Sequence, residues 1–524
     1  MPVNLQLSRY RWQRSHSGQV MLHGTFIYQA RQLDADALAL LLFSCEPVQW
    51  SSMLAEASGH FAVIVQHQCD TWLISDYVRS TALFYRQQPM DDGCSLIIIS
   101  DDWQSLTKND PIVQANAAVF DEFQALGYVT GAETLSADIQ QVEAAHLVKM
   151  SDSGLFAERY QTFVRTPDAG LSYPASLRTL EQLMNALAAQ CVAQAAGRQI
   201  VLPLSGGYDS RALLLALVGT GYPHIFCFTF GASGSAEMAV AKLLSTQCKV
   251  PWQPVFYDAP MWRRLRNDAE FARYLCFVSN GVAAPNVQVW PALQQLTQLK
   301  LIHPDALCIP GHTGDFVSGG HLIQDERPVA EVPLAAIARL IFNRHYQLHR
   351  DFRRKAACLL RIEQQLQRLL AGLPDSVTVE QLAESWNWQE RQSKFIVNSN
   401  RYYEFFGLDW WMPFWQRDFV RFWQMQPREH LIRQKLWRDF VDQQCLKMGL
   451  PQVQGNAGKA QRYPGWLQQG LNYFFDQNRL MSLIPFHLWV SYRLKLTRRH
   501  GTLFSYLGAK VLQRLGVKTR PHEN

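Results

Sequence analysis

The chain has 524 residues, of which 48% are hydrophobic and 18% are charged, and its formal net charge is +6. This length leaves room for two or three domains, and the composition excludes general disorder. The net charge is too small for a chain of this size to demand a nucleic-acid partner.

The cysteines and the apolar segments predict a cytoplasmic protein. The ten cysteines are scattered, without a C-x-x-C pair, which is typical of reduced thiols rather than of disulfides or a zinc site. The N-terminal stretch MPVNLQLSRYRWQRSHSGQ has no apolar core after its basic residues, so it does not resemble a secretory signal. Because no stretch reaches the roughly 18 continuous apolar residues of a membrane span, we expect no transmembrane segment.

Residues 1–165 predict a sheet-rich domain. Short β-branched and aromatic segments, separated by turn residues, follow one another in this region: HFAVIVQ, TWLISD, ALFYR and SLIIIS. The next stretch, TPDAGLSYPAS, has the Pro, Gly and Ser content of a linker. We therefore expect the first domain to end near residue 165.

From residue 177 helical and strand patterns alternate. LRTLEQLMNALAAQCVAQAAG has helical periodicity, RQIVLPL predicts a buried strand, and DSRALLLALVGTG predicts a helix that ends near glycines. HIFCFTF and AEMAVAKLLSTQC repeat the strand and helix pattern. This alternation predicts a doubly wound parallel sheet, in which ligands bind beyond the carboxyl ends of the strands.

The remainder of the chain predicts helices. From about residue 330 the segments are long and rich in Trp and Arg. Residues 466–524 are basic and amphipathic, which indicates a helical C-terminal extension. A solvated helical face is favoured for this extension over a tail that binds a membrane surface or a polyanion.

The stretch LPLSGGYDSRALLLAL places Ser-Gly-Gly-Tyr-Asp-Ser between a predicted strand and a predicted helix. The first N–H groups of such a helix attract anions, and Gly206 and Gly207 let a phosphate approach the backbone closely. Ser205 and Ser210 add hydroxyl groups, and Asp209 suits a phosphate site if a cation such as Mg²⁺ lies between them. The alternative from these six residues alone is a Gly-Gly turn with a Ser or Asp helix cap.

These residues resemble the asparagine synthetase-like family of N-type ATP pyrophosphatases. SGGYDS is similar to the pyrophosphate loop SGGxDS, CIPGHTGDFVSGGH to the loop SGEGxDExxGGY, and CFTFGASGSAEMAVAKLLSTQCKVPWQPVFY to the second strand and helix. YEFFGLDWWMPFWQRDFVRFWQMQP is similar to the stretch around VExRxPFLD. GHFAVIVQHQCDTWLISDYVRSTALFYR resembles the signature GxFAxxxxD and RDxxGxxPLYY of the glutaminase domain. The matches run in the same order along most of the chain.

The resemblance implies an α/β protein in three parts. An N-terminal Ntn-type β-sandwich (α+β) domain, of the class II glutaminase type, would occupy residues 1–165. A doubly wound parallel-sheet ATP pyrophosphatase domain with a helical C-terminal part would occupy residues 177–465, followed by the basic helical extension 466–524. The family's glutaminase uses a cysteine exposed by removal of Met1 as its nucleophile. Here Pro2 follows Met1, so we expect an inactive glutaminase domain, as in the related β-lactam synthetases and lasso-peptide cyclases.

The activity that the resemblance implies is ATP-dependent amide formation. A carboxylate substrate would be adenylated with release of pyrophosphate, and ammonia or an amine would then displace AMP. ATP is therefore the expected co-substrate and Mg²⁺ the expected metal. A homodimer is compatible with the resemblance, the sequence carries no strong nucleic-acid signal, and the oligomeric state and both substrates stay open.

The same resemblance assigns roles to individual residues. Asp209 and Asp315 would bind Mg²⁺, and Lys459 would be the catalytic lysine, with Lys435 and Lys447 as rivals. Further residues would contact ATP or pyrophosphate: Leu204, Ser205, Gly206, Gly207, Asp209, Ser210, Phe230, Pro310 and Gly311.

Four residues near these motifs have open interpretations. His312 stands where the family usually has Glu, which favours an acceptor other than free aspartate; it is either a base or a satisfied loop histidine. Tyr402, Tyr403 and Glu404 invite comparison with the Tyr and Glu pair of β-lactam synthetases, but aromatic core is the favoured interpretation.

Two alternatives to the ligase remain. The first is a noncatalytic subunit that keeps the nucleotide fold as a scaffold, which the intact loops Ser205–Ser210 and Asp315 disfavour. The second is an RNA-modifying pyrophosphatase-loop enzyme, for which no RNA-binding module is recognisable.

Overall fold

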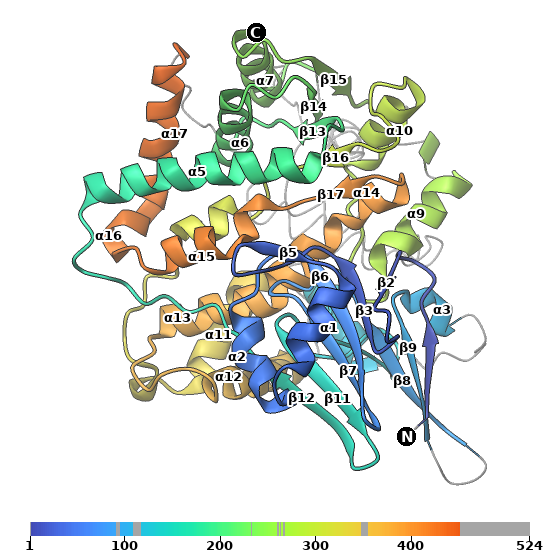
Figure 1. Cartoon of the computed structure of the whole chain (residues 1–524). Coiled ribbons are helices and arrows are strands. Elements are labelled where there is room, and N and C mark those ends of the chain that lie inside the picture. The colour runs from blue at the N-terminus through green and yellow to red at the C-terminus, as the bar shows by residue number, and fades with distance from the viewer. Residues whose placement is uncertain are drawn as a thin grey trace, which may run out of the picture.

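The computed structural model describes residues 2–90, 95–107, 117–231, 233–258, 261, 264–265, 268–346 and 355–450. Two antiparallel sheets form the lower part of the molecule in Figure 1, and a parallel sheet with its helices forms the upper part. The expected extension 466–524 lies outside the described residues.

The N-terminal part of the chain, Val3–Arg159, forms a sandwich of two sheets. The six-stranded sheet is antiparallel and has the order β12-β11-β7-β6-β3-β2, and the four-stranded sheet has the order β1-β9-β8-β10, with only β1 and β9 parallel. The strands are β1 (Val3–Gln6), β2 (Gln13–Arg14), β3 (Val20–Gly24), β6 (Phe61–His67), β7 (Asp70–Ser75), β8 (Phe84–Pro89), β9 (Ser95–Ser100), β10 (Ile139–Gln141), β11 (His146–Ser151) and β12 (Gly154–Arg159). A small hairpin is formed by β4 (Phe26–Tyr28) and β5 (Arg31–Leu33).

The core of the sandwich follows from alternation along the strands. Side chains of successive strand residues point to opposite faces. Ile64 therefore packs between the two sheets with Ile97, whereas Val63 and Val65 pack on the outer face of the six-stranded sheet. That outer face is covered by α1 (Ala35–Phe43) and α2 (Trp50–Ala55), which are joined through η1 (Pro47–Gln49).

The outer face of the four-stranded sheet is covered largely by helices from much later in the chain. Phe84 and Ile98 pack in one cluster with Ile341, Leu366 and Leu382. These three residues belong to α11 (Leu334–His345), α12 (Lys355–Leu370) and α13 (Val379–Trp386), which join α3 (Trp103–Thr107) and α4 (Ala117–Leu126) on this side. The expected domain boundaries, 1–165 and 177–465, stay a prediction. Part of the helical layer that covers the sandwich is formed by residues beyond 330.

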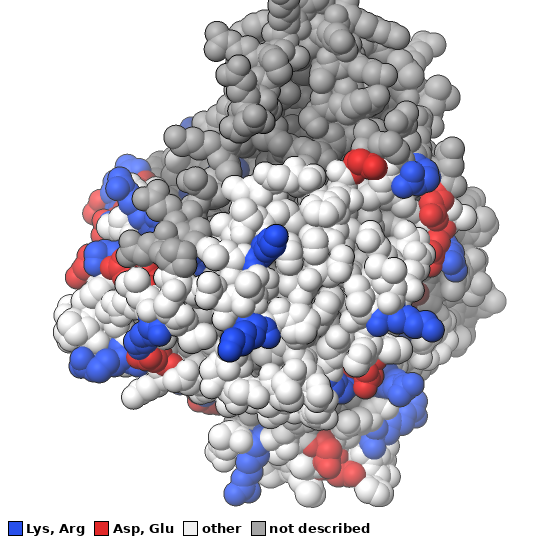
Figure 2. Space-filling model, turned by 90° about the horizontal axis from the view of Figure 1, so that it is seen from above, with Lys and Arg blue, Asp and Glu red and all other residues white. Residues whose placement is uncertain are grey.

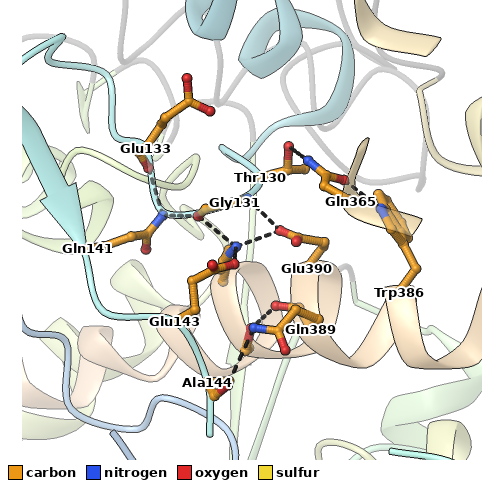
Figure 3. A network of polar contacts seen from close by, with 12 residues as sticks. Thr130, Gly131, Glu133, Gln141, Glu143, Ala144, Gln365, Trp386, Gln389 and Glu390 are labelled. Carbon is orange, nitrogen blue, oxygen red and sulfur yellow. Dashed lines mark hydrogen bonds and ion pairs between the residues drawn. The ribbon is translucent and has the colours of Figure 1, made fainter. Parts of the chain in front are cut away.

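A buried ion network joins the sandwich to the π-helix η4 (Asn387–Val397). Lys394 Nζ lies 2.6 Å from Glu390 Oε2 and 3.1 Å from Glu143 Oε1, and it donates to the carbonyl of Gly131 at 2.8 Å. Glu390 in turn accepts the backbone N–H of Gly131 (Figure 3). Because the Lys394–Glu390 ion pair is buried, its stability depends on the additional contacts with Glu143 and Gly131.

The middle part of the chain, from Ile200 to Trp410, forms the predicted parallel sheet. Its order is β15-β14-β13-β16-β17, and every neighbouring pair is parallel. The strands are β13 (Ile200–Pro203), β14 (Ile225–Gly231), β15 (Trp252–Phe256), β16 (Leu307–Cys308) and β17 (Asp409–Trp410).

Helices cover both faces of this sheet, as a doubly wound fold requires. Leu202 and Cys227 face α5 (Tyr173–Ala195), α6 (Tyr208–Gly219), α7 (Ala236–Gln247) and α17 (Lys435–Lys447). Val201 and Phe228 face α9 (Ala269–Ser279), α10 (Trp290–Gln298) and α14 (Arg401–Phe405). The expectation of a doubly wound parallel sheet is confirmed.

Short elements complete the described chain, namely η2 (Phe316–Gly320), η3 (Val329–Glu331), η5 (Pro413–Trp415), α15 (Arg417–Gln424), α16 (Arg428–Leu431) and η6 (Ile432–Gln434). Every cysteine among the described residues is a free thiol. No single helix of the described part has the length and apolarity to cross a membrane; the helices Ala35–Phe43 and Pro47–Ala55 meet those criteria only as a pair bent by 110°.

Candidate functional site

The parallel sheet reverses its winding beside β13. The chain adds β14 and β15 on one side of β13, and later adds β16 and β17 on the other. In open parallel sheets, ligands bind beyond the carboxyl ends of the strands at such a reversal. The two loops that leave β13 and β16 are therefore where the fold favours a site, and they carry the two sequence motifs.

The first loop turns from β13 into α6 and is held by its own hydroxyls. Ser205 Oγ lies 3.0 Å from Ser210 Oγ and accepts the N–H of Gly207 at 3.2 Å, while Ser210 Oγ accepts the N–H of Ser205 at 3.0 Å. Gly207 is the N-cap of α6, and Asp209 lies in its first turn. The start of α6, with its N–H groups that have no partner within the helix, therefore faces the carboxyl edge of the sheet.

The second loop follows β16 and packs directly against the first. A Cβ on Gly311 would lie 2.9 Å from Ser210 N, and a Cβ on Gly314 would lie 2.5 Å from Asp209 Cγ. Only glycine permits these approaches without displacement of the first loop. The two motifs, which are far apart in the sequence, are thus in direct contact in the fold.

Asp209 and Asp315 meet at this junction. The backbone N–H of Asp315 donates to Asp209 Oδ2 at 2.9 Å, and the indole Nε1 of Trp437 donates to Asp209 Oδ1 at 2.7 Å. Trp437 comes from α17 and has no exposed surface. The Asp209 carboxylate is therefore oriented from two sides, and the Asp315 side chain is the more exposed of the two acids.

The negative charges of the Asp209 and Asp315 carboxylates repel each other. Burial and the neighbouring charge of Asp315 raise the pKa of Asp209 to about 8. Burial also disfavours the charged form of Asp315, but the hydrogen bond and charge of His321, together with the charge of Arg391, outweigh it and lower the pKa of Asp315. Without a cation, these opposite shifts favour a proton on Asp209 and the negative charge on Asp315.

A chain of side chains from η4 fixes Asp315. Gln392 Nε2 donates to Asn387 Oδ1 at 3.2 Å, which leaves Asn387 Nδ2 to donate to His321 Nδ1 at 3.2 Å. On the other side of the ring, His321 Nε2 lies 3.1 Å from Asp315 Oδ2. Of these residues, the sequence patterns singled out only Asp315.

The residues fit a magnesium ion that also binds phosphate oxygens. Among the described residues no group of three or more His, Cys, Asp or Glu side chains could hold a metal. Magnesium commonly takes only one or two protein carboxylates when a substrate phosphate supplies other ligands. The raised pKa of Asp209 agrees with a cation site. Part of this shift comes from repulsion between the two acids, and a divalent cation between them would offset that repulsion.

The other predicted nucleotide contacts lie along the same edge. Leu204 is buried, and its N–H donates to Phe228 O at 2.8 Å. Phe230, near the end of β14, stacks on Tyr257 with ring centroids 5.5 Å apart. Pro310, which precedes Gly311 in the loop after β16, is buried. The structure brings these residues to the loops, and their contact with ATP stays a prediction.

His312 pairs with Tyr402, whose hydroxyl lies 3.1 Å from His312 Nε2. Burial lowers the pKa of His312 to about 4, so the ring is neutral near pH 7. Tyr403 is buried in the core, and Glu404 binds Tyr10 and Trp410 rather than Tyr402. These contacts do not form the Tyr and Glu pair that the sequence comparison considered.

The candidate lysines have different positions. Lys459 lies outside the described residues. Lys435 Nζ lies 3.6 Å from the ring centroid of Tyr173, and Lys447 forms an ion pair with Glu181 at 2.5 Å. The two rivals are therefore engaged with α5.

The face seen from above in Figure 2 shows its described Lys and Arg side chains scattered, with Asp and Glu at its margins. The described part of this face carries no single block of basic side chains.

No model of a known protein family matches the chain, and no curated protein matches it in sequence. In structure the chain is similar to an allosteric regulatory enzyme of purine biosynthesis, with 10% identity, 47% of this chain covered and a TM-score of 0.20. It is also similar to a glutamine phosphoribosylpyrophosphate amidotransferase from B. subtilis in complex with ADP and GMP, with 10% identity, 59% of this chain covered and a TM-score of 0.20. The matches span 62% and 64% of those chains, somewhat under two thirds, and at this similarity they say nothing of activity.

Proposed function

We propose that the protein is an ATP-dependent, AMP-forming amide ligase of the asparagine synthetase-like kind. The observation that carries the proposal is the contact of Asp315 with Asp209, across the two loops at the sheet reversal. Two acids from separate loops beside a helix start suit a metal-bound triphosphate.

The proposed reaction has two steps. A substrate carboxylate oxygen attacks the α-phosphorus of ATP, the bond to the β-phosphate oxygen breaks, and pyrophosphate leaves. Ammonia or an amine then attacks the acyl carbon, loses a proton, and displaces AMP to leave an amide. Activation is needed because an unactivated carboxylate has no adequate leaving group at neutral pH.

The residues of the two loops would bind and orient the phosphates. The start of α6 and the hydroxyls of Ser205 and Ser210 would donate to the pyrophosphate portion, where negative charge grows. Asp209 and Asp315 would hold Mg²⁺, which supplies positive charge against that oxygen. Lys459 is proposed as the lysine that acts on the α-phosphate.

The amide nitrogen is proposed to come from ammonia or from a substrate amine. The first cysteine of the printed sequence, Cys45, lies at the end of α1, where its thiol donates weakly to the carbonyls of Leu41 and Leu42. Because Pro2 stands where the family's glutaminase has its nucleophilic cysteine, we expect no glutamine hydrolysis by the protein itself.

The test is exchange of labelled pyrophosphate into ATP with a panel of amino acids, uronic acids and peptide acids. At least one acid is expected to support exchange in the presence of Mg²⁺, and Asp209→Ala and Asp315→Ala are expected to abolish it. Exchange that persists unchanged in either variant contradicts the assigned metal site.

A further inference from the structure

Arg211 lies directly behind the loop between β13 and α6. It follows the stretch SGGYDS and is the fourth residue of α6. Its side chain has no exposed surface. A buried cation is costly unless hydrogen bonds and opposite charge compensate it. The partners of Arg211 therefore indicate what this side chain does in the fold.

Arg211 binds the backbone of the loop. Its Nη2 donates to the carbonyl oxygen of Gly206 at 3.0 Å. This carbonyl precedes Gly207, the N-cap of α6, so it lies outside the hydrogen-bond ladder of the helix. The Arg211 guanidinium thus supplies the Gly206 carbonyl with a bond that the helix itself does not make.

The bond to Arg211 sets the direction of the next N–H group. The described chain has no cis peptide bonds, and in a trans peptide the carbonyl and the N–H point to opposite sides. Because the Gly206 carbonyl points to the buried guanidinium, the N–H of Gly207 points away from it, where it meets Ser205 Oγ at 3.2 Å. Gly207 is exposed. Arg211 therefore aims a loop donor at the side of the peptide on which a phosphate would bind.

Helix α17 supports Arg211 and its neighbours. Arg211 Nη1 lies 3.9 Å from Asp442 Oδ1, and the hydroxyl of Tyr208 lies 3.5 Å from Asp442 Oδ2. Arg211 Cζ also lies 5.0 Å from the centroid of the Tyr208 ring. The same helix supplies Trp437, which donates to Asp209. The start of α6 is thus held from α17, and Arg211 extends this support to the backbone of the loop.

The charge of Arg211 favours an anion at the loop. The N-terminal end of a helix carries partial positive charge, so an anion is favoured there and a cation is disfavoured. Arg211 nevertheless places a buried guanidinium near the start of α6. Its distance of 3.9 Å from Asp442 is longer than that of a hydrogen-bonded ion pair. Pyrophosphate bound at the loop would offset both the charge of Arg211 and that of the helix start.

We propose that Arg211 is a positioning residue for the leaving pyrophosphate, because it orients the Gly206–Gly207 peptide and adds positive charge behind the loop. The inference rests on the proposed ligase function, and it requires no contact between Arg211 and the substrate. The binding of pyrophosphate depends on Arg211 in this account. The binding of AMP, the other product of ATP cleavage, does not.

The test compares calorimetric titrations of the wild type and Arg211→Gln with pyrophosphate and with AMP, both in the presence of Mg²⁺. Arg211→Gln is expected to bind pyrophosphate about tenfold or more weakly, since a buried charge and its hydrogen bond are lost. Its affinity for AMP is expected to equal that of the wild type. The matched control is Arg198→Gln, which is expected to keep both affinities. Arg198 also donates to backbone carbonyls, those of Gln194 and Ala195, but it precedes β13 at the opposite edge of the sheet.

The outcomes separate this inference from the proposed function. A wild type that does not bind pyrophosphate with Mg²⁺ contradicts the proposed phosphate site, and the role of Arg211 falls with it. If the wild type binds pyrophosphate, an unchanged affinity in Arg211→Gln, or an equal loss for pyrophosphate and AMP, overturns the role of Arg211 alone.

A second variant covers the case in which Arg211→Gln does not fold. Arg211→Lys keeps the charge but lacks the planar fork that binds Gly206 and faces Asp442 at once. It is expected to bind pyrophosphate about threefold or more weakly than the wild type, with AMP binding unchanged. Wild-type affinity for pyrophosphate in Arg211→Lys would then overturn the proposal.

Discussion

His321 holds Asp315: its Nε2 lies 3.1 Å from Asp315 Oδ2, and Asn387 fixes the other side of the ring. Asp315 is the more exposed acid of the proposed metal pair. Its charge and orientation therefore depend on His321, the C-cap of η2, and on Asn387 of η4. Because η4 also carries Lys394, one helix contacts both the sandwich and the loop after β16.

Replacement of His321 is expected to weaken the metal site. In His321→Ala, Asp315 loses its orienting hydrogen bond, and Mg²⁺ affinity is expected to fall by about 10-fold to 100-fold. The measurement is the Mg²⁺ dependence of nucleotide binding or of pyrophosphate exchange. The control is His16→Ala, an exposed histidine between β2 and β3, far along the chain from both loops. An unchanged Mg²⁺ dependence in His321→Ala contradicts this role.

Stability of the ligand-free protein is expected to fall as the pH rises from about 4 to about 8. The folded state raises the pKa of Asp209 from 3.8 to about 8, so over this range it holds a proton that the unfolded chain has released. The lowered pKa of Asp315 changes the stability only at pH values below about 4. Asp209→Asn is expected to flatten the slope of Tm against pH. The same slope in the variant means that Asp209 is not the responsible group.

A methyl group at Gly314 is expected to disable the site without unfolding the protein. Its Cβ would lie 2.5 Å from Asp209 Cγ, so the carboxylate must move. Gly314→Ala is expected to lower the rate of pyrophosphate exchange by about 100-fold or more, as loss of a preorganised contact does. Gly219→Ala, at the end of α6, meets nothing within 4 Å and serves as the matched control. Equal activity of the two variants would refute the crowding argument.

Lys394 is expected to matter for stability far more than a surface lysine. Lys394→Met leaves Glu390 and Glu143 buried without their cation, and the expected loss is about 3–5 kcal/mol. Lys447→Met, which breaks the half-exposed pair with Glu181, is expected to cost less than about 1 kcal/mol. Urea unfolding of both variants checks this. Similar midpoints for the two variants would show that the buried network contributes little.

The sequence predicted the parallel sheet and its two loops because each is encoded locally. The alternation around RQIVLPL and HIFCFTF fixes strands and helices, and SGGYDS marks the turn between β13 and α6. The approach of the second loop to Asp209 was anticipated only through the family resemblance, since spacing along the chain does not determine it.

The supporting residues of the site were not predictable in this way. Trp437 is separated from Asp209 by 228 positions, and Asn387 from His321 by 66. Neither lies in a pattern that distinguishes it from a core aromatic or a helix amide. The packing of α11, α12 and α13 against the four-stranded sheet was missed for the same reason, because amphipathic helices do not specify which apolar face they cover.

The central claim, that Asp209 and Asp315 together bind a divalent cation with ATP, is tested most directly by calorimetric titration with a non-hydrolysable ATP analogue. The wild type is expected to bind the analogue at least tenfold more tightly with Mg²⁺ than with a chelator. Asp209→Ala and Asp315→Ala are each expected to remove that difference. A Mg²⁺ dependence that survives intact in both variants would contradict the account.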